Sequence, residues 1–373
     1  MVDRTRESVS LVAVGDVMLG DHPVCFGHGV RTCIDRIGID AFLVGVAPLL
    51  KGHDIAIGNL EAVLSAGLCG RSDLEHEEMR GRPEFAAGLS RAGFNVMTVA
   101  NNHALHHGER DFMESVQLLK ASGVEPIGLL THDGGLNCWS YERNGVRVGL
   151  VGYSVRPEKY QPGTQHYAHG SGEQLLAEIR KLASQYSALV VSIHWGDEYL
   201  QVPSPGQVDL GRRIIDAGAT VVLGHHPHVL QGIETYRGGY IVYSLGNFIF
   251  DHWEESGRQS LAVHFELSRD GVSDMRLIPI WIGEDFRPQI ALGERRDDIL
   301  KLVSDLSARV EEFVAVPDKV AAAAQYATIA DRAYLRYRLD SYRYFLTRLW
   351  SYKPSVIRQS AVRALRRRVS KSI

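Results

Sequence analysis

Short runs of apolar, β-branched residues recur along the first two thirds of the chain, and each run stops at a polar cluster. Such runs are typical of strands that a sheet buries on both faces. They predict strands over residues 9–14, 54–57, 95–99, 146–151, 188–193, 220–223 and 240–244. Between several of these runs, apolar residues recur at helical spacing. That pattern predicts helices over residues 110–122, 172–184 and 205–217. Alternating strands and helices indicate an α/β fold.

The pattern changes twice toward the C-terminus. Residues 261–267 and 275–282 alternate between apolar and polar positions with no helix between them, which predicts an antiparallel addition to the sheet. Residues 296–313 have the pattern of a helix. We therefore expect a catalytic domain over residues 1–316 and a helical extension over residues 317–373.

The extension is rich in alanine, arginine and tyrosine over residues 320–350, and Pro354 interrupts its helical pattern. Residues 353–373 carry seven basic residues and no acidic one. We expect a basic, solvated helix that packs on the core through its apolar side chains. These are Val356, Ile357, Val362, Leu365 and Val369. The alternative is a docking arm for an acidic peptide, an acidic polymer or a membrane surface.

Composition narrows the class of protein. The 373 residues include 41 basic and 44 acidic ones, so the overall charge does not suggest a nucleic-acid partner. No apolar run is long enough to span a membrane, and no apolar segment follows the charged first residues, so we expect a cytoplasmic protein. The cysteines lack the spacing of a metal or redox motif, and we expect free thiols. They are Cys25, Cys33, Cys69 and Cys138.

Polar residues with acid–base or ligand chemistry follow the predicted strands. Asp16 follows the first strand, and Asn59 and Glu61 follow the second. Each signal is weak alone, because strands often end in Gly-Asp or Gly-Asn for turn reasons. In α/β sheets, however, ligands bind beyond the carboxyl ends of the strands. We therefore expect these strand ends to meet in one crevice.

Two histidine-rich segments give stronger signals. Asn102 and His103 follow the third strand, with His106 and His107 close behind. Buried imidazoles need polar partners, so three histidines within five residues favour function over packing. His226 and His228 lie two residues apart in an extended segment and so point to one side. That spacing suits two ligands of one metal, or one ligand for each of two metals.

Two further strand ends complete the set. His194 ends an apolar run, where a satisfied core histidine is the alternative interpretation, and Glu198 lies four residues further on. Asn247 follows the strand predicted at residues 240–244, and we interpret it as a turn residue rather than a substrate contact.

In their order along the chain, six segments resemble the CapA family, which is named for poly-γ-glutamate capsule synthesis. The segments are Gly-Asp-Val-Met-Leu-Gly, Asn-Leu-Glu, Ala-Asn-Asn-His, His-Trp-Gly-x-Glu-Tyr, Gly-His-His-Pro-His-Val-Leu-Gln and Ser-Leu-Gly-Asn-Phe. The resemblance runs from about residue 11 to residue 282 and excludes the extension. It implies the fold of the calcineurin-like metallophosphatase superfamily, an α/β sandwich of two helix-flanked sheets with a metal site at its rim.

The resemblance also implies roles by position. Asp16 and His228 resemble the ligands of a first metal, and Glu61 takes the bridging position. The ligands implied for a second metal are Asn102, His194 and His226. His103 resembles a general acid/base beside the metal.

Two positions depart from the pattern. Met18 stands where the superfamily commonly has a histidine ligand, and His106 stands where the family usually has an aspartate. The first site is therefore poorer in strong ligands. We expect one or two divalent ions, with Ca²⁺, Mg²⁺ or Mn²⁺ favoured over Zn²⁺.

A metal with neighbouring imidazoles supports two reactions. It activates water for cleavage of an amide or phosphoester bond, or the acid–base groups move a proton at Cα of a peptide-type substrate. The resemblance covers both reactions, because it implies a link to extracellular poly-γ-glutamate, as in the classic members of the family, or to the epimerisation of ribosomal peptides, as in some soluble relatives. The absence of an export segment favours an enzyme with a peptide-type substrate over a capsule-export component. The extra His106 and the loss at Met18 favour epimerisation at Cα, as in ribosomal peptide modification. The alternative is hydrolysis of peptide, γ-glutamyl amide or phosphoester bonds linked to poly-γ-glutamate, and an acidic polymer is the alternative substrate. The catalytic candidates are His103, His106, Asp16, His194 and Glu198. A non-catalytic assembly component that binds its partner through the basic extension is the third possibility.

Overall fold

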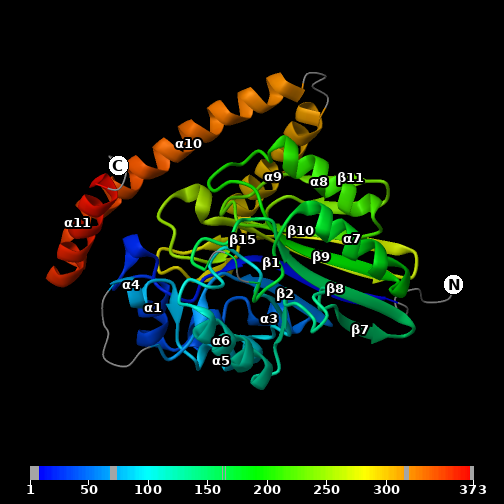
Figure 1. Cartoon of the computed structure of the whole chain (residues 1–373), viewed down its shortest axis with the longest axis horizontal. Helices are drawn as coiled ribbons and strands as arrows, with labels where there is room; N and C mark the ends of the chain where they lie inside the picture. The colour runs from blue at the N-terminus through cyan, green and yellow to red at the C-terminus, as the bar shows by residue number, and fades with distance from the viewer. Residues whose placement is uncertain (1–7, 68–73, 162, 164, 315–318, 370–373) are drawn as a thin grey trace.

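The computed structural model describes residues 8–67, 74–161, 163, 165–314 and 319–369. Two β-sheets pack face to face, and helices cover the outer face of each (Figure 1). The layer between the sheets is apolar, with fully buried side chains from both, such as Leu11, Ile57, Val148 and Val190. The predicted α/β sandwich of two helix-flanked sheets is confirmed.

The first sheet has the strand order β16-β15-β14-β1-β2-β5-β6. Its parallel half is β1 (Val9–Val17), β2 (Ile55–Leu60), β5 (Val96–Thr98) and β6 (Glu125–Ile127). Its antiparallel half is β14 (Gln259–Ser268), β15 (Gly271–Ile282) and β16 (Pro288–Ile290), as the alternating pattern predicted for the first two. The short strand β13 (Asn247–Ile249) pairs with the end of β1.

The second sheet has the order β11-β12-β10-β9-β8-β7. Its parallel strands are β8 (Val146–Ser154), β9 (Ala188–His194), β10 (Val221–His225) and β12 (Gly239–Val242). The edges are antiparallel, with β7 (Trp139–Arg143) on one side and β11 (Ile233–Tyr236) on the other. A separate pair joins β3 (Val63–Leu64) to β4 (Arg80–Gly81).

Helices cover the outer faces in two groups (Figure 1). The first sheet is covered by α1 (Val30–Ile37), α2 (Ile39–Leu43), α3 (Ala47–Lys51), α5 (Phe85–Ala92) and α6 (Glu109–Ala121), with the single turn α4 (Leu74–Glu77) nearby. The second is covered by α7 (Gly172–Leu182) and α8 (Pro205–Asp216). Both α7 and α8 begin with a capping box, in which Ser171 pairs with Gln174 and Ser204 with Gln207.

The C-terminal part is helical, as predicted. Helix α9 (Gly293–Val314) contacts β11 and β15, α10 (Lys319–Thr347) runs along the outside of the molecule, and α11 (Pro354–Val369) follows a short 3-10 turn (Figure 1). The boundary predicted between residues 316 and 317 lies outside the described residues. No helix in the described part of the chain is long and apolar enough to cross a bilayer.

Two smaller expectations have mixed outcomes. In α11, Val356 is buried, whereas Val362 is 42% exposed and does not pack as predicted. The side chains of Leu365 and Val369 lie outside the described residues. Cys25, Cys33 and Cys138 are free thiols, as expected, and Cys69 also lies outside them.

Candidate metal centre

The strand ends of both sheets meet at one edge of the sandwich, as the sequence predicted. Asp16 is near the end of β1 and Glu61 directly follows β2. From the second sheet, His194 is the last residue of β9, and His226 and His228 follow β10. All five side chains are buried. The strands are longer than predicted, so Asp16 and His194 belong to the strands rather than to the loops after them.

Glu61 lies at the middle of this cluster. Its Oε1 is 3.6 Å from His194 Nε2 and 3.7 Å from His228 Nε2. Two groups of three potential ligands share it: Glu61, His226 and His228 form one, and Asp16, Glu61 and His194 form the other. Within each group, the ligand atoms lie within 4.8 Å of one another. A carboxylate shared by two such groups has the position that a bridging ligand occupies.

The polar atoms that lack partners indicate that these residues fit a cation. Both carboxylate oxygens of Glu61 and both ring nitrogens of His226 are buried without a hydrogen-bond partner among the described residues. Burying such groups unpaired is costly, and native structures leave few of them. A divalent ion would accept lone pairs from the carboxylate and from a neutral imidazole, so the donor set suits a metal.

Carboxamides orient the ligands from behind. Asn59 Nδ2 donates to Asp16 Oδ1 (2.8 Å) and lies 3.3 Å from His194 Nδ1. Asn101 Nδ2 donates in turn to Asn59 Oδ1 (3.2 Å). Asn102 Oδ1 lies 2.8 Å from His194 Nε2, which places the predicted amide ligand within the cluster. The sequence analysis placed Asn59 at a strand end of the crevice but gave it no role, and it did not single out Asn101.

The loop after β10 is held in an unusual conformation. His226 and His228 both have positive φ, 96° and 58°, which is uncommon for residues other than glycine. Such strain persists where surrounding contacts enforce it, and it concentrates at functional sites. Here the His226 N–H donates to Asp16 Oδ2 (3.2 Å), and His228 Nδ1 lies 3.0 Å from Asn247 Oδ1.

The interpretation of Asn247 as a turn residue is wrong. It is the first residue of β13, and its Nδ2 donates to the carbonyls of His228 (3.1 Å) and Gly257 (2.9 Å). Its side chain therefore fixes the position of His228. His225, which the sequence left without a role, lies with Nδ1 3.3 Å from Asp16 Oδ1.

The surroundings of the cluster shift the pKa values of its two carboxyl groups in opposite directions. Burial alone would raise the pKa of Asp16, but His225 and His228 beside it hold that pKa well below its usual value. Burial raises the pKa of Glu61 well above its usual value, and the charges of Asp16 and Glu198 add to this effect. Burial opposes protonation of His228, yet the carboxylates of Glu61 and Asp16 raise its pKa to about 10. A divalent cation would neutralise the two carboxyl groups that this cluster holds together.

A second histidine group adjoins the cluster on the loop after β5. His103 Nδ1 lies 3.2 Å from His106 Nδ1 and 3.3 Å from the Tyr160 hydroxyl. His106 Nε2 lies 3.3 Å from Glu78 Oε1, and the His106 ring stacks on Tyr160. His107 bonds the backbone carbonyl of Glu78 (2.9 Å). The structure therefore joins His103 and His106 in one hydrogen-bonded chain that ends at Glu78.

Charged side chains of two loops lie at the edge of the centre. The charge of Glu198, a predicted catalytic residue, raises the pKa of Glu61 and of His228. The charge of Arg156 contributes to the lowered pKa of His194 and His226, for which burial is the main cause. Lys159 opposes the raised pKa of Glu61. The sequence analysis named neither Arg156 nor Lys159, because nothing in their sequence surroundings distinguishes them from ordinary loop cations.

Two face-to-face sheets with carboxylate, carboxamide and imidazole groups at their joined strand ends define the calcineurin-like metallophosphatase class of fold. The family of bacterial capsule synthesis proteins called PGA_cap matches residues 10–252, and the chain belongs to this family. The resemblance predicted from the six segments is confirmed.

The chain is similar to curated relatives and, more distantly, to solved structures. The chain is 31% identical to the capsule biosynthesis protein CapA of Bacillus anthracis over 75% of this chain and 69% of that protein. It is 29% identical to the PGA biosynthesis protein CapA of Bacillus subtilis (strain 168), over 73% and 71% of the two chains. A putative 5'-nucleotidase from Staphylococcus aureus is 14% identical, with a TM-score of 0.45, over 80% of this chain and 58% of that one.

Proposed function

We propose that this protein is a metal-dependent enzyme that acts by acid–base catalysis on a carboxylate-rich peptide chain of the poly-γ-glutamate type. The observation that carries the proposal is the hydrogen-bonded chain from His103 through His106 to Glu78, which begins beside the ligand cluster. The names of the CapA relatives, which refer to capsule and PGA biosynthesis, support the substrate class.

The residues that would hold the metal are those whose ligand atoms converge. Glu61, His226 and His228 would form one set of ligands, and Asp16, Glu61 and His194 the other, with Asn102 beside His194. This grouping differs from the pairing that the resemblance implies, Asp16 with His228 and His194 with His226. A bound divalent ion would supply a Lewis acid that polarises a carbonyl, carboxylate or phosphoryl oxygen. The carboxylate and carboxamide oxygens in this set suit Ca²⁺, Mg²⁺ or Mn²⁺.

His103 is the proposed proton carrier. Burial, with the neighbouring charge of His106, holds its pKa well below the usual value, so the ring is neutral at neutral pH. Its Nδ1 faces His106 and Tyr160, which leaves Nε2 for the substrate. A proton taken up at Nε2 can be balanced by release from Nδ1 toward His106 and Glu78. Imidazoles suit this exchange because they donate at one nitrogen and accept at the other.

Two loop cations support an acidic substrate. Arg156 and Lys159 lie near enough to the ligand cluster to change the pKa values of its members. The Arg156 Nε is buried without a hydrogen-bond partner in the part of the chain that the structure describes. Arg156 already pairs through Nη1 with Asp197 Oδ1 (3.3 Å) and with the Gly196 carbonyl (2.8 Å). The positive charge that the two cations add near the ligand cluster is therefore what favours an acidic substrate.

We favour proton transfer at Cα, which epimerises the residue, as the reaction. Glu198 enters from the loop after β9, and the His103 chain from the loop after β5, so two acid–base groups come from separate loops. Inversion at Cα needs one group to remove the proton and another to return it. Met18, at the position of a missing ligand, is fully buried and its Sδ accepts the Gly20 N–H (3.2 Å).

Hydrolysis of a γ-glutamyl amide or a phosphoester is the second candidate, and the fold class favours it. In that reaction His103 would take a proton from the attacking water at Nε2 and then pass it to the leaving group, a task for which the same geometry serves.

The test is mass spectrometry after incubation of the metal-loaded protein in D₂O with poly-γ-glutamate, carboxylate-ended peptides and a phosphoester. Deuterium gained at Cα in an intact chain is the expected result. Cleaved products without exchange would replace epimerisation by hydrolysis. Neither change, in protein shown to hold its metal, would overturn the enzymatic proposal in favour of a non-catalytic assembly role. Protein with His103→Gln is the matched control, because it keeps all six proposed ligands.

A further inference from the structure

Helix α10 carries an apolar stripe that faces away from the rest of the molecule. Its members recur at intervals of four, three, four and four residues, so they lie along one side of the helix and of the turn after it. They are Leu335 (56% exposed), Leu339 (60%), Tyr342 (55%), Leu346 (61%) and Trp350 (82%). Contiguous exposed apolar surface of this kind marks an interaction site. We call these five residues the outer stripe.

The opposite side of α10 is fixed to the body of the protein, so the outer stripe is not a packing face that could turn inward. Tyr337 stacks on Tyr199, with ring centroids 3.7 Å apart and an angle of 12° between the planes. Tyr344 stacks on Trp253, and the Tyr326 hydroxyl donates to Asp197 Oδ2 (2.9 Å). The contacts of α10 with the body therefore hold the outer stripe toward solvent.

Positive charge accompanies the stripe. Arg332, Arg336 and Arg343 are exposed beside it on the same helix. From residue 332 to the end, the sequence has twelve basic residues and one acidic residue, Asp340. Asp340 lies 3.6 Å from Arg336 at Nε, and it is only partly exposed. An occupant of the stripe must therefore offer an apolar layer together with negative charge.

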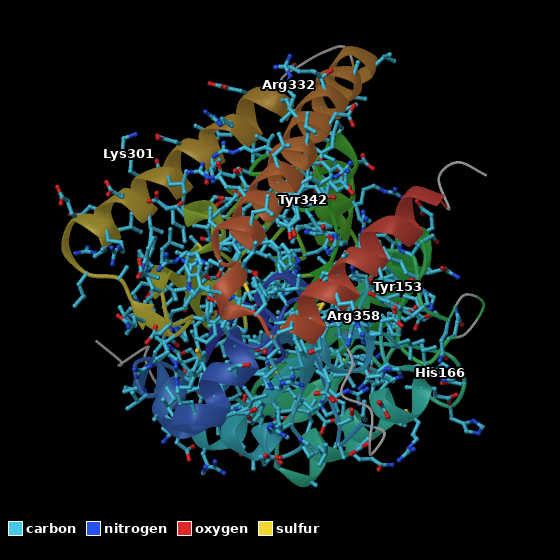
Figure 2. The ribbon with its side chains drawn as sticks, turned by 90° about the vertical axis from the view of Figure 1, so that its left-hand side faces the viewer. Tyr153, His166, Lys301, Arg332, Tyr342 and Arg358 are labelled. Atoms are coloured by element: carbon cyan, nitrogen blue, oxygen red, sulfur yellow. The ribbon has the colours of Figure 1, made fainter. Side chains whose placement is uncertain are left out.

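We propose that the outer stripe of α10 docks the protein on an anionic phospholipid surface. Leucines enter the acyl boundary in such a contact, tryptophan and tyrosine lie at the headgroup level, and arginines pair with lipid phosphates. Figure 2 looks onto this side of the molecule: α10, with Arg332 and Tyr342, passes across the front, and α11 with Arg358 lies beside it. The two helices form one outer edge of the molecule in Figure 1, where a flat surface can approach.

Charge argues against a second copy as the occupant. In a pair of α10 helices joined by their stripes, Arg336 and Arg343 would face basic residues of the other copy. Like charges at the flanks of a helix pair oppose association. The outer stripe lies outside residues 10–252, and the proposal does not depend on the chemistry of the metal centre.

The experiment is vesicle flotation with the full chain. Vesicles of phosphatidylcholine and phosphatidylglycerol in a ratio of roughly three to one are compared with vesicles of phosphatidylcholine alone, at low and at high salt. We expect binding that is about tenfold stronger on the anionic vesicles and that weakens with salt, because screening reduces the attraction of exposed charges.

Two double variants and two control substitutions assign the contact to the stripe. Leu339→Asp with Leu346→Asp, and Arg336→Glu with Arg343→Glu, should each reduce binding about tenfold. Leu292→Asp is the matched control for the leucines, because Leu292 is 77% exposed and lies outside α10. Lys301→Glu is the control for charge, since Lys301 is exposed on α9 (Figure 2). Circular dichroism of each variant confirms that the helices remain.

Three outcomes would overturn the proposal. Binding that the two control substitutions reduce as much as the stripe substitutions would reflect the overall charge of the protein. Failure of folded wild-type protein to bind anionic vesicles, with salt-sensitive capture of poly-γ-glutamate that only the arginine variant loses, would identify an acidic polymer as the occupant. Concentration-dependent dimers in sedimentation that Leu339→Asp with Leu346→Asp dissociates would identify a second copy instead.

Discussion

The two histidine groups at the sheet edge differ in how their nitrogens are used. In the loop after β10, both nitrogens of His226 are buried and lack partners, and the backbone is held at positive φ. In the loop after β5, His103, His106 and His107 each have a ring nitrogen within 3.3 Å of a polar partner. An imidazole without a partner beside carboxylates is suited to a cation, whereas linked imidazoles are suited to moving protons. Two segments that look alike in sequence thus differ in chemistry.

Removal of the first group should have the largest effect. His226→Ala combined with His228→Ala removes two proposed ligands, so we expect metal affinity to fall by roughly a hundredfold or more and turnover to be lost. Calorimetric titration with Mn²⁺ and elemental analysis of the purified protein measure the change. His132→Ala, at an exposed position, is the control. Undiminished metal content in the double variant would show that the cluster is not the metal site.

His103→Gln tests the second group. The variant keeps the proposed ligands and loses a proton carrier, so we expect metal content to be unchanged and the rate constant kcat to fall by about 10²–10⁴. Steady-state kinetics on the substrate identified by deuterium exchange measure it. A variant that loses its metal as well would place His103 among the ligands, and the contrast between the two groups would disappear.

Interruption of the hydrogen bonds that link His103 through His106 to Glu78 should have a smaller effect on kcat. His106→Gln leaves His103 in place and breaks its connection to Glu78, and we expect a decrease in kcat of about tenfold. His107→Gln is the matched comparison, because His107 bonds the backbone carbonyl of Glu78 instead of its carboxylate. We expect its kcat to stay within about twofold of the wild type. Equal losses in the two variants would indicate a role in packing.

His252 sharpens the comparison with the smallest effect. Its Nε2 is buried without a hydrogen-bond partner in the described structure, as are both ring nitrogens of His226. Unlike His226, its ring stacks on that of Trp253, with the centroids 5.1 Å apart. Burial, aided by the charge of His228, lowers the pKa of His252 to about 3. The unfolded chain, in which histidine has its ordinary pKa near 6.5, binds the proton first as the pH falls. This group therefore stabilises the fold above that value, and its contribution is lost on acidification.

Urea unfolding at pH 7 and pH 5.5 measures this contribution. We expect the free energy of unfolding to fall by about 1 kcal/mol more in the wild type than in His252→Asn, whose side chain can still accept the Glu254 N–H. The same pH dependence in both proteins would mean that His252 takes up its proton in the folded state as readily as in the unfolded state. Burial would then not keep the ring neutral.

The sequence predicted the sheets well because their strands are buried on both faces and so have continuous apolar runs, as in residues 188–193 and 220–223. It also predicted that the strand ends would converge, since parallel strands bring their carboxyl ends to one edge. It did not predict the roles of Asn59 and Asn101, because a carboxamide at a strand end has the same signature whether it closes a turn or orients a ligand. Their partners, Asp16 and Asn59, belong to different strands, and only the strand order brings them together.

Contacts between distant segments account for the other omissions. Glu78 and Tyr160 approach His106 from loops that lie far from it in sequence, and no local pattern marks either residue. The basic and aromatic composition of residues 320–350 predicted a helix, but not that its two sides would differ. One side packs tyrosines on the body, and the other leaves leucines exposed.

The stack of Tyr337 on Tyr199 ties the extension to the metal centre. Tyr199 has a φ of 66°, and its N–H donates to the carbonyl of Pro227 (2.7 Å), which lies between His226 and His228. One ring stack and one backbone hydrogen bond therefore connect α10 to the histidine loop. A protein shortened before α10 would therefore lose not only its basic tail but also the Tyr337 contact that supports Tyr199 and, through it, the loop of the proposed ligands.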